Sequence, residues 1–140
     1  MRADNLHATL VFLGDVAERR LEALSLAAQE VQGRKFDLTF DLAHYWGHNH
    51  IVHAAPAMIP AQLAQLVLDL EQALARHRFH FDQRNAYQPH VTLLRHAQWS
   101  DAPLPEMPAV RWRMDGFTLM QSVQDEQGAS YQALARFPLR

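Results

Sequence analysis

Cysteine is absent from the 140 residues of this sequence, which excludes disulfide bonds and thiolate metal ligands. A reducing compartment, the cytoplasm, is the expected location. Surplus positive charge is also absent, because 13 Lys and Arg against 15 Asp and Glu give a formal net charge of −2. Proteins that grip long stretches of nucleic acid usually carry a basic stripe. Any nucleic-acid partner should therefore be recognised at an end or as a small moiety in a pocket.

Long apolar runs are lacking as well. No stretch is apolar enough to cross a membrane, and the polar start, Met1 to Asn5, lacks the pattern of a signal peptide. No linker or low-complexity segment divides the chain. We therefore expect a single domain over residues 1–140 that is not associated with a membrane.

The hydrophobic pattern is that of a mixed α and β protein. Helices are expected from about Asp15 to Gly33 and from Pro60 to about His77, where apolar residues recur at helical spacing. Strands are expected at residues 6–13, 36–42, 51–55, 79–81, 90–95, 110–114, 117–122 and 131–137. A histidine-rich loop is expected at 44–50, and a proline-rich loop at 101–108. The fold class is therefore α+β, with antiparallel hairpins at the end of the chain.

Two short stretches of the chain resemble each other. His7-Ala8-Thr9-Leu10 and His90-Val91-Thr92-Leu93 both read His-x-Thr-Leu, and both fall on expected strands. Threonine occurs only four times, and two of those four residues follow a histidine at the same spacing. Residues two apart on a strand share a face, so each strand presents one imidazole and one hydroxyl to the same side.

This set of side chains suits a phosphodiester substrate. A neutral histidine can take a proton from water, while a protonated histidine gives one to the leaving oxygen. Threonine hydroxyls can donate hydrogen bonds to the non-bridging oxygens as negative charge builds there. The chemistry requires neither a metal ion nor another cofactor. The alternative, two solvent-facing strand positions with no role, is less favoured because the motif is duplicated.

At these residues the sequence resembles the 2H phosphoesterases, in particular the branch of RNA 2′,3′-cyclic phosphodiesterases also called 2′-5′ RNA ligases. The similarity is carried by residues 5–14 and 87–95, and by the ending at 117–122 and 128–131. It covers essentially the whole chain. The resemblance implies two pseudo-symmetric lobes of antiparallel sheet, with helices packed outside and an active-site cleft between the lobes.

The resemblance also implies roles for individual residues. His7 would be the proton donor and His90 the proton acceptor, while Thr9 and Thr92 would hold the phosphate. Arg95 would lie near the phosphate or the base. The product would be a 2′-phosphomonoester, and the substrates would be RNA ends or cyclic nucleotides.

The sequence departs from the family at its beginning. Members of the family normally carry a strand and a helix before the first motif, whereas here that motif begins within a few residues of Met1. The domain is therefore expected to be short at its N-terminus. An unpaired sheet edge near the first motif should then be covered by self-association.

Several alternatives remain open. Tyr45 and Trp46 are candidates for stacking on a nucleobase, with closing the core as an equal alternative. His48 and His50 could hold zinc, although a solvated or RNA-facing loop is favoured. Arg111 and Arg113, two further candidates, could contact an RNA backbone, but a solvated strand face is favoured.

Three other functions stay open beside hydrolysis. Reversible 2′-5′ ligation would use the same atoms in reverse. A relative that binds a nucleotide without turnover, or a metal-binding histidine loop, would belong to other classes of protein. Turnover of a cyclic nucleotide in a chelator would separate hydrolysis from the binding and metal classes.

Overall fold

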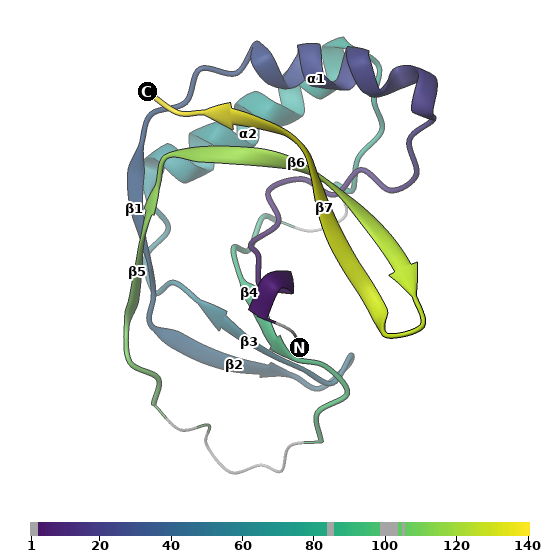
Figure 1. Cartoon of the computed structure of the whole chain (residues 1–140). Coiled ribbons are helices and arrows are strands. Elements are labelled where there is room, and N and C mark those ends of the chain that lie inside the picture. The colour runs from purple at the N-terminus through teal and green to yellow at the C-terminus, as the bar shows by residue number, and fades with distance from the viewer. Residues whose placement is uncertain (1–2, 84–85, 99–103, 105) are drawn as a thin grey trace.

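The computed structural model describes residues 3–83, 86–98, 104 and 106–140 (Figure 1). Two short 3-10 helices, η1 and η2, cover Ala3–Asn5 and Glu18–Arg20, and the α-helices are α1 (Leu21–Gln29) and α2 (Ala61–Arg76). The strands are β1 (Phe36–Phe40), β2 (Leu42–Trp46), β3 (Ile51–Ala55), β4 (Val91–Leu94), β5 (Val110–Met114), β6 (Gly116–Asp125) and β7 (Gly128–Pro138). Half of the proline-rich loop expected at 101–108, residues 101–103 and 105, lies outside the described residues.

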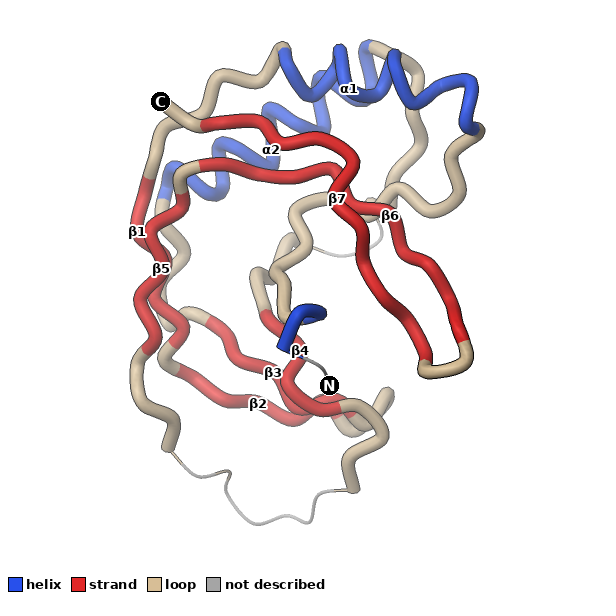
Figure 2. Tube along the Cα trace, in the orientation of Figure 1, coloured by secondary structure: helices blue, strands red, loops and turns tan. Residues whose placement is uncertain are grey.

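The strands form three antiparallel sheets, ordered β1-β5, β2-β3-β4 and β6-β7. Figures 1 and 2 show one lobe made of the β6-β7 hairpin with α1 and α2, and a second lobe made of β2-β3-β4. Strands β1 and β5 run between them along one side, and the N-terminal segment passes through the middle. This is the α+β architecture expected from the sequence.

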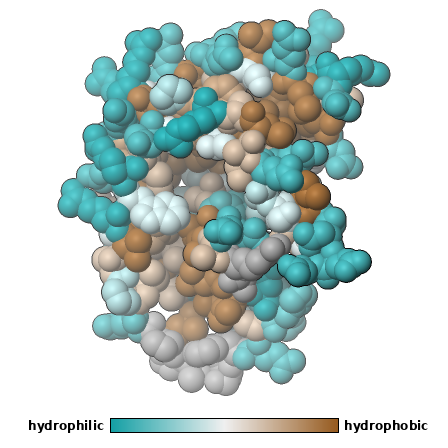
Figure 3. Space-filling view, viewed as in Figure 1, coloured by the Kyte–Doolittle hydropathy of each residue, from teal (hydrophilic) through white to brown (hydrophobic). Residues whose placement is uncertain are grey.

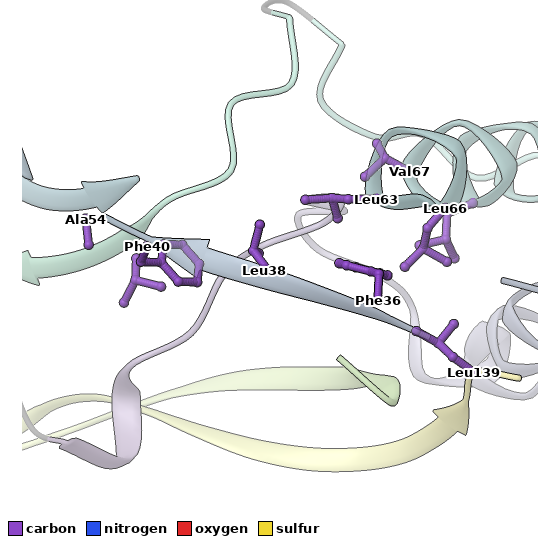
Figure 4. Packing of buried hydrophobic residues seen from close by; sticks show 10 residues of the cluster. Phe36, Leu38, Phe40, Ala54, Leu63, Leu66, Val67 and Leu139 are labelled. Carbon is purple, nitrogen blue, oxygen red and sulfur yellow. The ribbon is translucent and has the colours of Figure 1, made fainter. Parts of the chain in front are cut away.

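Helix α2 supplies one wall of the main core. Its five residues at helical spacing, Leu63, Leu66, Val67, Leu70 and Leu74, are all buried, as their pattern predicts. Figure 4 shows Leu63, Leu66 and Val67 on the helix and Phe36, Leu38 and Phe40 spaced along β1. Burying a side chain of this size stabilises a fold by about 1.5–3 kcal/mol, so α2 and β1 form the main support of the molecule.

Strand β1 has one buried face and one face that is more exposed to solvent, as the alternation of its apolar and polar residues predicts. Its polar residue Asp37 lies opposite Arg113 in the ladder with β5 and accepts hydrogen bonds from Arg111 and Arg113 at 2.9 and 3.3 Å. These bonds lower the pKa of Asp37, the one from Arg111 contributing most. The two arginines are thus engaged in an exposed ion-pair cluster, and we assign them no RNA contact.

Three expectations about local structure are wrong. Residues 6–13 form no strand beyond a single bridge at Ala8, because one neighbouring residue does not make a ladder. Residues 79–81 are not a strand, and Phe79 closes the C-terminus of α2 through its N–H to the Leu74 carbonyl. The histidine-rich loop begins later than expected, because His44, Tyr45 and Trp46 belong to β2 and pair with β3.

The first α-helix also begins later than expected. Residues Glu18–Arg20 form a 3-10 turn, and α1 starts at Leu21 without a side-chain cap, so Asp15 does not cap it. Gly33 lies beyond the helix in a tight contact, where a Cβ atom would be 2.8 Å from a Leu139 methyl group. Among the helices of the described residues, none is long and apolar enough to span a bilayer.

Candidate active site

The two His-x-Thr motifs lie side by side in the structure. An antiparallel bridge joins Ala8 to Val91, and both residues pack on the core side. Continued by one residue in each direction, this register places His7 beside Thr92 and His90 beside Thr9. The four side chains line one cleft, so the structure brings together the residues that the duplicated motif singled out.

Both histidines are oriented in the same way by the backbone. The Nδ1 atom of His7 lies 2.6 Å from the Asn5 carbonyl oxygen, and that of His90 lies 2.8 Å from the Gln88 carbonyl oxygen. A carbonyl oxygen only accepts hydrogen bonds, so Nδ1 is the donor in each ring. Each Nε2 is left to accept a proton when the ring is neutral or to donate one when it is charged.

An aromatic ring packs against each of the two histidines. The ring of Tyr131, on β7, is 4.6 Å from that of His7 between centroids, and the ring of Trp46, on β2, is 4.8 Å from that of His90. The first contact is tilted, and the second is edge-to-face. These contacts restrict the rotation of both imidazoles, which acid–base catalysis requires of groups that must meet a substrate at fixed positions.

Tyr87 forms a second link between the two motifs. Its hydroxyl donates a hydrogen bond of 3.1 Å to the carbonyl oxygen of Thr9, across 78 residues of sequence. Burial raises the pKa of Tyr87 to about 12, so the hydroxyl keeps its proton at neutral pH. The sequence analysis assigned this residue no role, and only its position three residues before His90 could have drawn attention to it.

A further histidine lies beside the second motif. His53 on β3 pairs with Thr92 on β4 and with His44 on β2, so these residues share one face of the three-stranded sheet. The His53 ring lies 3.8 Å from that of Trp46 and 5.6 Å from that of His90, between centroids. The sequence analysis assigned His53 no role, because the pairing of β3 with β2 and β4 cannot be seen in the sequence of β3 alone.

His53 is also the one buried polar residue found among the described residues, with 3% of its surface exposed. Its Nδ1 atom is buried and has no hydrogen-bond partner in that part of the chain. Burial, followed by repulsion from His90 and His44, lowers the pKa of His53 to about 4. The ring is therefore neutral around pH 7 and adds no charge beside His90.

The cleft that holds the motifs has a volume of about 1240 Å³. Arg95, which follows β4, lines it together with the four motif residues. The cleft continues into apolar residues of the core, among them Leu38 and Leu66, and Figure 3 shows apolar side chains near the middle of this face with hydrophilic ones around the rim. A cleft of this volume can hold a nucleotide.

The two aromatic candidates, Tyr45 and Trp46, differ in their surroundings. Trp46 contacts the ring of His90, as described above. The hydroxyl of Tyr45 donates to the Ala97 carbonyl oxygen at 2.9 Å and lies 3.0 Å from Nδ1 of His50. Tyr45 therefore ties the end of β2 to the segment after β4.

The histidines of the loop do not form a metal centre with their neighbours. Within the part of the chain that the structure describes, no three His, Cys, Asp or Glu side chains are gathered closely enough to hold a metal ion. His50 contacts Tyr45, and the His48 ring lies 6.2 Å from that of Trp46. The zinc site considered from the sequence gains no support.

Comparisons with known proteins agree on one family. Residues 1–126 match the sequence pattern of the 2′-5′ RNA ligase superfamily. The RNA 2′,3′-cyclic phosphodiesterase of Escherichia coli K12 is 36% identical over 139 residues, which are 98% of this chain and 77% of that protein.

Solved structures agree with the sequence match. E. coli LigT in its apo form superimposes with a TM-score of 0.89 at 33% identity, over 99% of this chain and 78% of LigT. LigT complexed with 3′-AMP gives 0.88 at 34% identity, over 99% of this chain and 79% of that one. A protein of Thermus thermophilus, TT0787, at 24% identity and a TM-score of 0.75 over 96% and 78% of the two chains, shares the fold. The two-lobed α+β fold is thereby confirmed, and the chain belongs to the 2′-5′ RNA ligase superfamily.

Proposed function

We propose that this protein hydrolyses the 2′,3′-cyclic phosphate at the end of an RNA or on a nucleotide. The observation that carries the proposal is the pairing of the two motifs across the Ala8–Val91 bridge, which sets two histidines and two threonines along one cleft. The likeness to a cyclic phosphodiesterase of E. coli over nearly the whole chain supports the same reaction. The proposed substrates are therefore RNA ends or cyclic nucleotides.

The reaction needs a proton acceptor on one side of the phosphorus and a proton donor on the other. The neutral Nε2 of His90 takes a proton from water, whose oxygen bonds to phosphorus. The P–O3′ bond breaks, and Nε2–H of His7 gives its proton to the leaving 3′ oxygen. The product is a 2′-phosphomonoester with a free 3′-hydroxyl. The Nδ1–carbonyl bonds support this scheme because they leave Nε2 of each ring for the substrate.

The remaining residues of the proposed site bind the substrate. The hydroxyls of Thr9 and Thr92 donate to the non-bridging oxygens as charge develops on them. Arg95 supplies a positive charge for the phosphate. Trp46, next to His90, is better placed than Tyr45 to face a nucleobase, since the Tyr45 hydroxyl is engaged with Ala97.

Turnover in a chelator tests the proposal directly. The protein is incubated with a nucleoside 2′,3′-cyclic phosphate in excess EDTA, and the products are separated by chromatography. We expect the nucleoside 2′-phosphate, formed at the rate seen without EDTA. Absence of turnover would refute the proposal, and activity restored by zinc would favour the histidine-loop metal site instead.

Ligation of 2′-5′ ends is a second candidate, because the matched family carries this activity in its name. It is the same ring opening, in which a 5′-hydroxyl of a second RNA replaces water: its oxygen bonds to phosphorus, the P–O3′ bond breaks, and the 3′ oxygen takes the proton. Incubating the protein with one RNA ending in a cyclic phosphate and another with a free 5′-hydroxyl measures both reactions at once. Joined product in excess over hydrolysed product would make ligation the main activity.

Self-association through an open edge is also proposed. Residues 6–13 make one strand bridge, at Ala8, and Phe12 is 65% exposed. Unpaired backbone and exposed apolar groups favour contact with another chain. Sedimentation at micromolar concentration should give the mass of a dimer or larger assembly, whereas a stable monomer would refute this proposal. A single domain and a cytoplasmic location remain predictions from the sequence.

A further inference from the structure

A second hollow, of about 360 Å³, adjoins the cleft. His90 lines both, so a group bound in the hollow lies one side chain away from the proposed phosphate site. The other residues used below come from β2, β3, the segment before α2 and the segment before β4: His44, Trp46, His53, Ile59, Gln88 and Pro89. Its volume is at the lower end of the range for small-ligand pockets, which fits one flat ring system.

The chemistry of the walls favours a neutral, aromatic ligand. Trp46 offers a ring, Ile59 and Pro89 offer apolar surface, and the side chains of His44 and Gln88 carry groups that hydrogen-bond. Among the described residues that line the hollow there is no Lys, Arg, Asp or Glu. A phosphate would need a cation there, because charge-assisted bonds dominate phosphate recognition.

The buried ring of His53 also lines the hollow. Its 3% exposure and its unpaired Nδ1 make it an unusual choice for a position that serves stability alone. Its lowered pKa keeps it neutral, so this ring attracts no anion. A neutral imidazole beside the Trp46 ring therefore agrees with the other lining residues in favouring an uncharged ring.

From these contacts we infer that the hollow beside His90 binds the nucleobase of the nucleotide whose cyclic phosphate is opened, which rests on the proposed function. In a nucleoside 2′,3′-cyclic phosphate a single sugar joins the base to the phosphate, and His90 is a lining residue of both spaces. Trp46 stacks on the base, while Gln88 and His44 bond to its edge. Arg95, on the cleft, is then left for the phosphate.

Filling the hollow tests this inference. The Ile59→Trp variant places a large side chain in it, and Met58→Trp is a matched control, since Met58 is 84% exposed and does not line the hollow. Each is assayed on a nucleoside 2′,3′-cyclic phosphate and on its base-free analogue, in which hydrogen replaces the base at C1′. His44→Ala is a second variant that opens the wall instead of filling it.

Stacking on an aromatic ring contributes about 1–3 kcal/mol per base. Ile59→Trp should thus lower kcat/KM for the nucleotide at least about fivefold, while its rate on the base-free analogue stays within about twofold of the unmodified protein. Met58→Trp should change neither rate, and His44→Ala should act in the same direction as Ile59→Trp. An equal loss on both substrates, or no loss on the nucleotide, would overturn the inference.

Binding separates this inference from the proposed reaction. Calorimetry compares a nucleoside 2′-phosphate with its base-free analogue for the unmodified protein and for Ile59→Trp. If the unmodified protein turns over neither substrate, the proposed function fails, but tighter binding of the nucleoside form that Ile59→Trp abolishes would still support the base site. Equal affinity for both ligands would overturn the base site even if turnover is normal.

Discussion

The same four-residue motif is supported in two different ways in this molecule. The second motif lies on β4, which pairs with β3 and through it with β2, and its histidine packs against Trp46 and the buried His53. The first motif has one bridge, at Ala8, and its histidine packs against Tyr131 of the β6-β7 hairpin. In both, Nδ1 of the histidine bonds to the carbonyl oxygen two residues earlier.

Comparing the two motifs separates the features that both histidines share from the support that each motif receives from the surrounding fold. Both halves keep the Nδ1 bond and an aromatic neighbour, so these two features are common to the two histidines. The three-stranded sheet is specific to the second half. The first motif instead depends on contacts from elsewhere, namely the bridge to Val91, the Tyr87 hydroxyl on Thr9, and the bond from the Asn5 amide to the Ala129 carbonyl on β7.

Removal of either imidazole should have the largest effect and should affect both halves alike. The variants His7→Ala and His90→Ala should each lower kcat for a cyclic nucleotide by about 10²–10⁴, the usual value of one acid–base group. The double variant should be little worse than either single one, because the two groups act in one step. Single-turnover rates would measure this directly.

His80→Ala is the matched control for these variants. His80 is exposed, lines neither the cleft nor the hollow, and should leave turnover unchanged. Near-normal turnover by one motif variant alone would break the equivalence of the two halves and would assign the chemistry to the other histidine.

The pH dependence of stability should differ between the two halves, because the buried His53 lies beside the second motif. Its pKa is about 4 in the folded protein against an ordinary value of 6.5, so the unfolded chain binds the proton more tightly. Lowering the pH from 6.5 to 4 therefore favours unfolding, by up to about 3 kcal/mol in the free energy of unfolding. Below pH 4 both states are protonated, and this contribution changes no further.

Urea unfolding of the unmodified protein and of His53→Phe across pH 4–7 would measure this. As the pH falls, the free energy of unfolding should decrease more for the unmodified protein than for His53→Phe, whichever of the two is more stable at pH 7. The other titrating groups are the same in both proteins, so their contributions cancel in the difference. Parallel curves over this range would contradict the assignment of a low pKa to His53.

Sequence patterns predicted the elements whose own residues carry a strong period. Helix α2 and strand β1 are buried along the predicted faces, because their periodicity alone decides what faces the core. Strand β2 was missed because His44, Tyr45 and Trp46 show no alternation and are extended through pairing with β3. Residues 6–13 alternate well but lack the neighbours that a strand needs.

The residues of the site also divide into those that the sequence predicts and those that only the structure shows. The duplicated motif drew attention to His7 and His90 because repetition is visible in one chain, and the structure brings the two together. His53, Tyr87 and Tyr131 reach the site through pairings between segments far apart in the chain, which no spacing in the sequence displays. Reading the register of β3 against β4 is what reveals that His53 shares a face with Thr92.

The smallest expected effect concerns the ring that supports the first histidine. Tyr131→Ala removes the ring that packs 4.6 Å from His7, and such ring contacts contribute about 0.5–1.5 kcal/mol beyond the area they bury. We expect a fall in kcat of roughly threefold to tenfold. The Tyr131→Phe variant keeps the ring without the hydroxyl, so it should retain nearly full kcat if packing is what matters. Equal losses for both variants would show instead that the hydroxyl acts on His7 or the substrate, and the two halves would then differ in chemistry as well as in support.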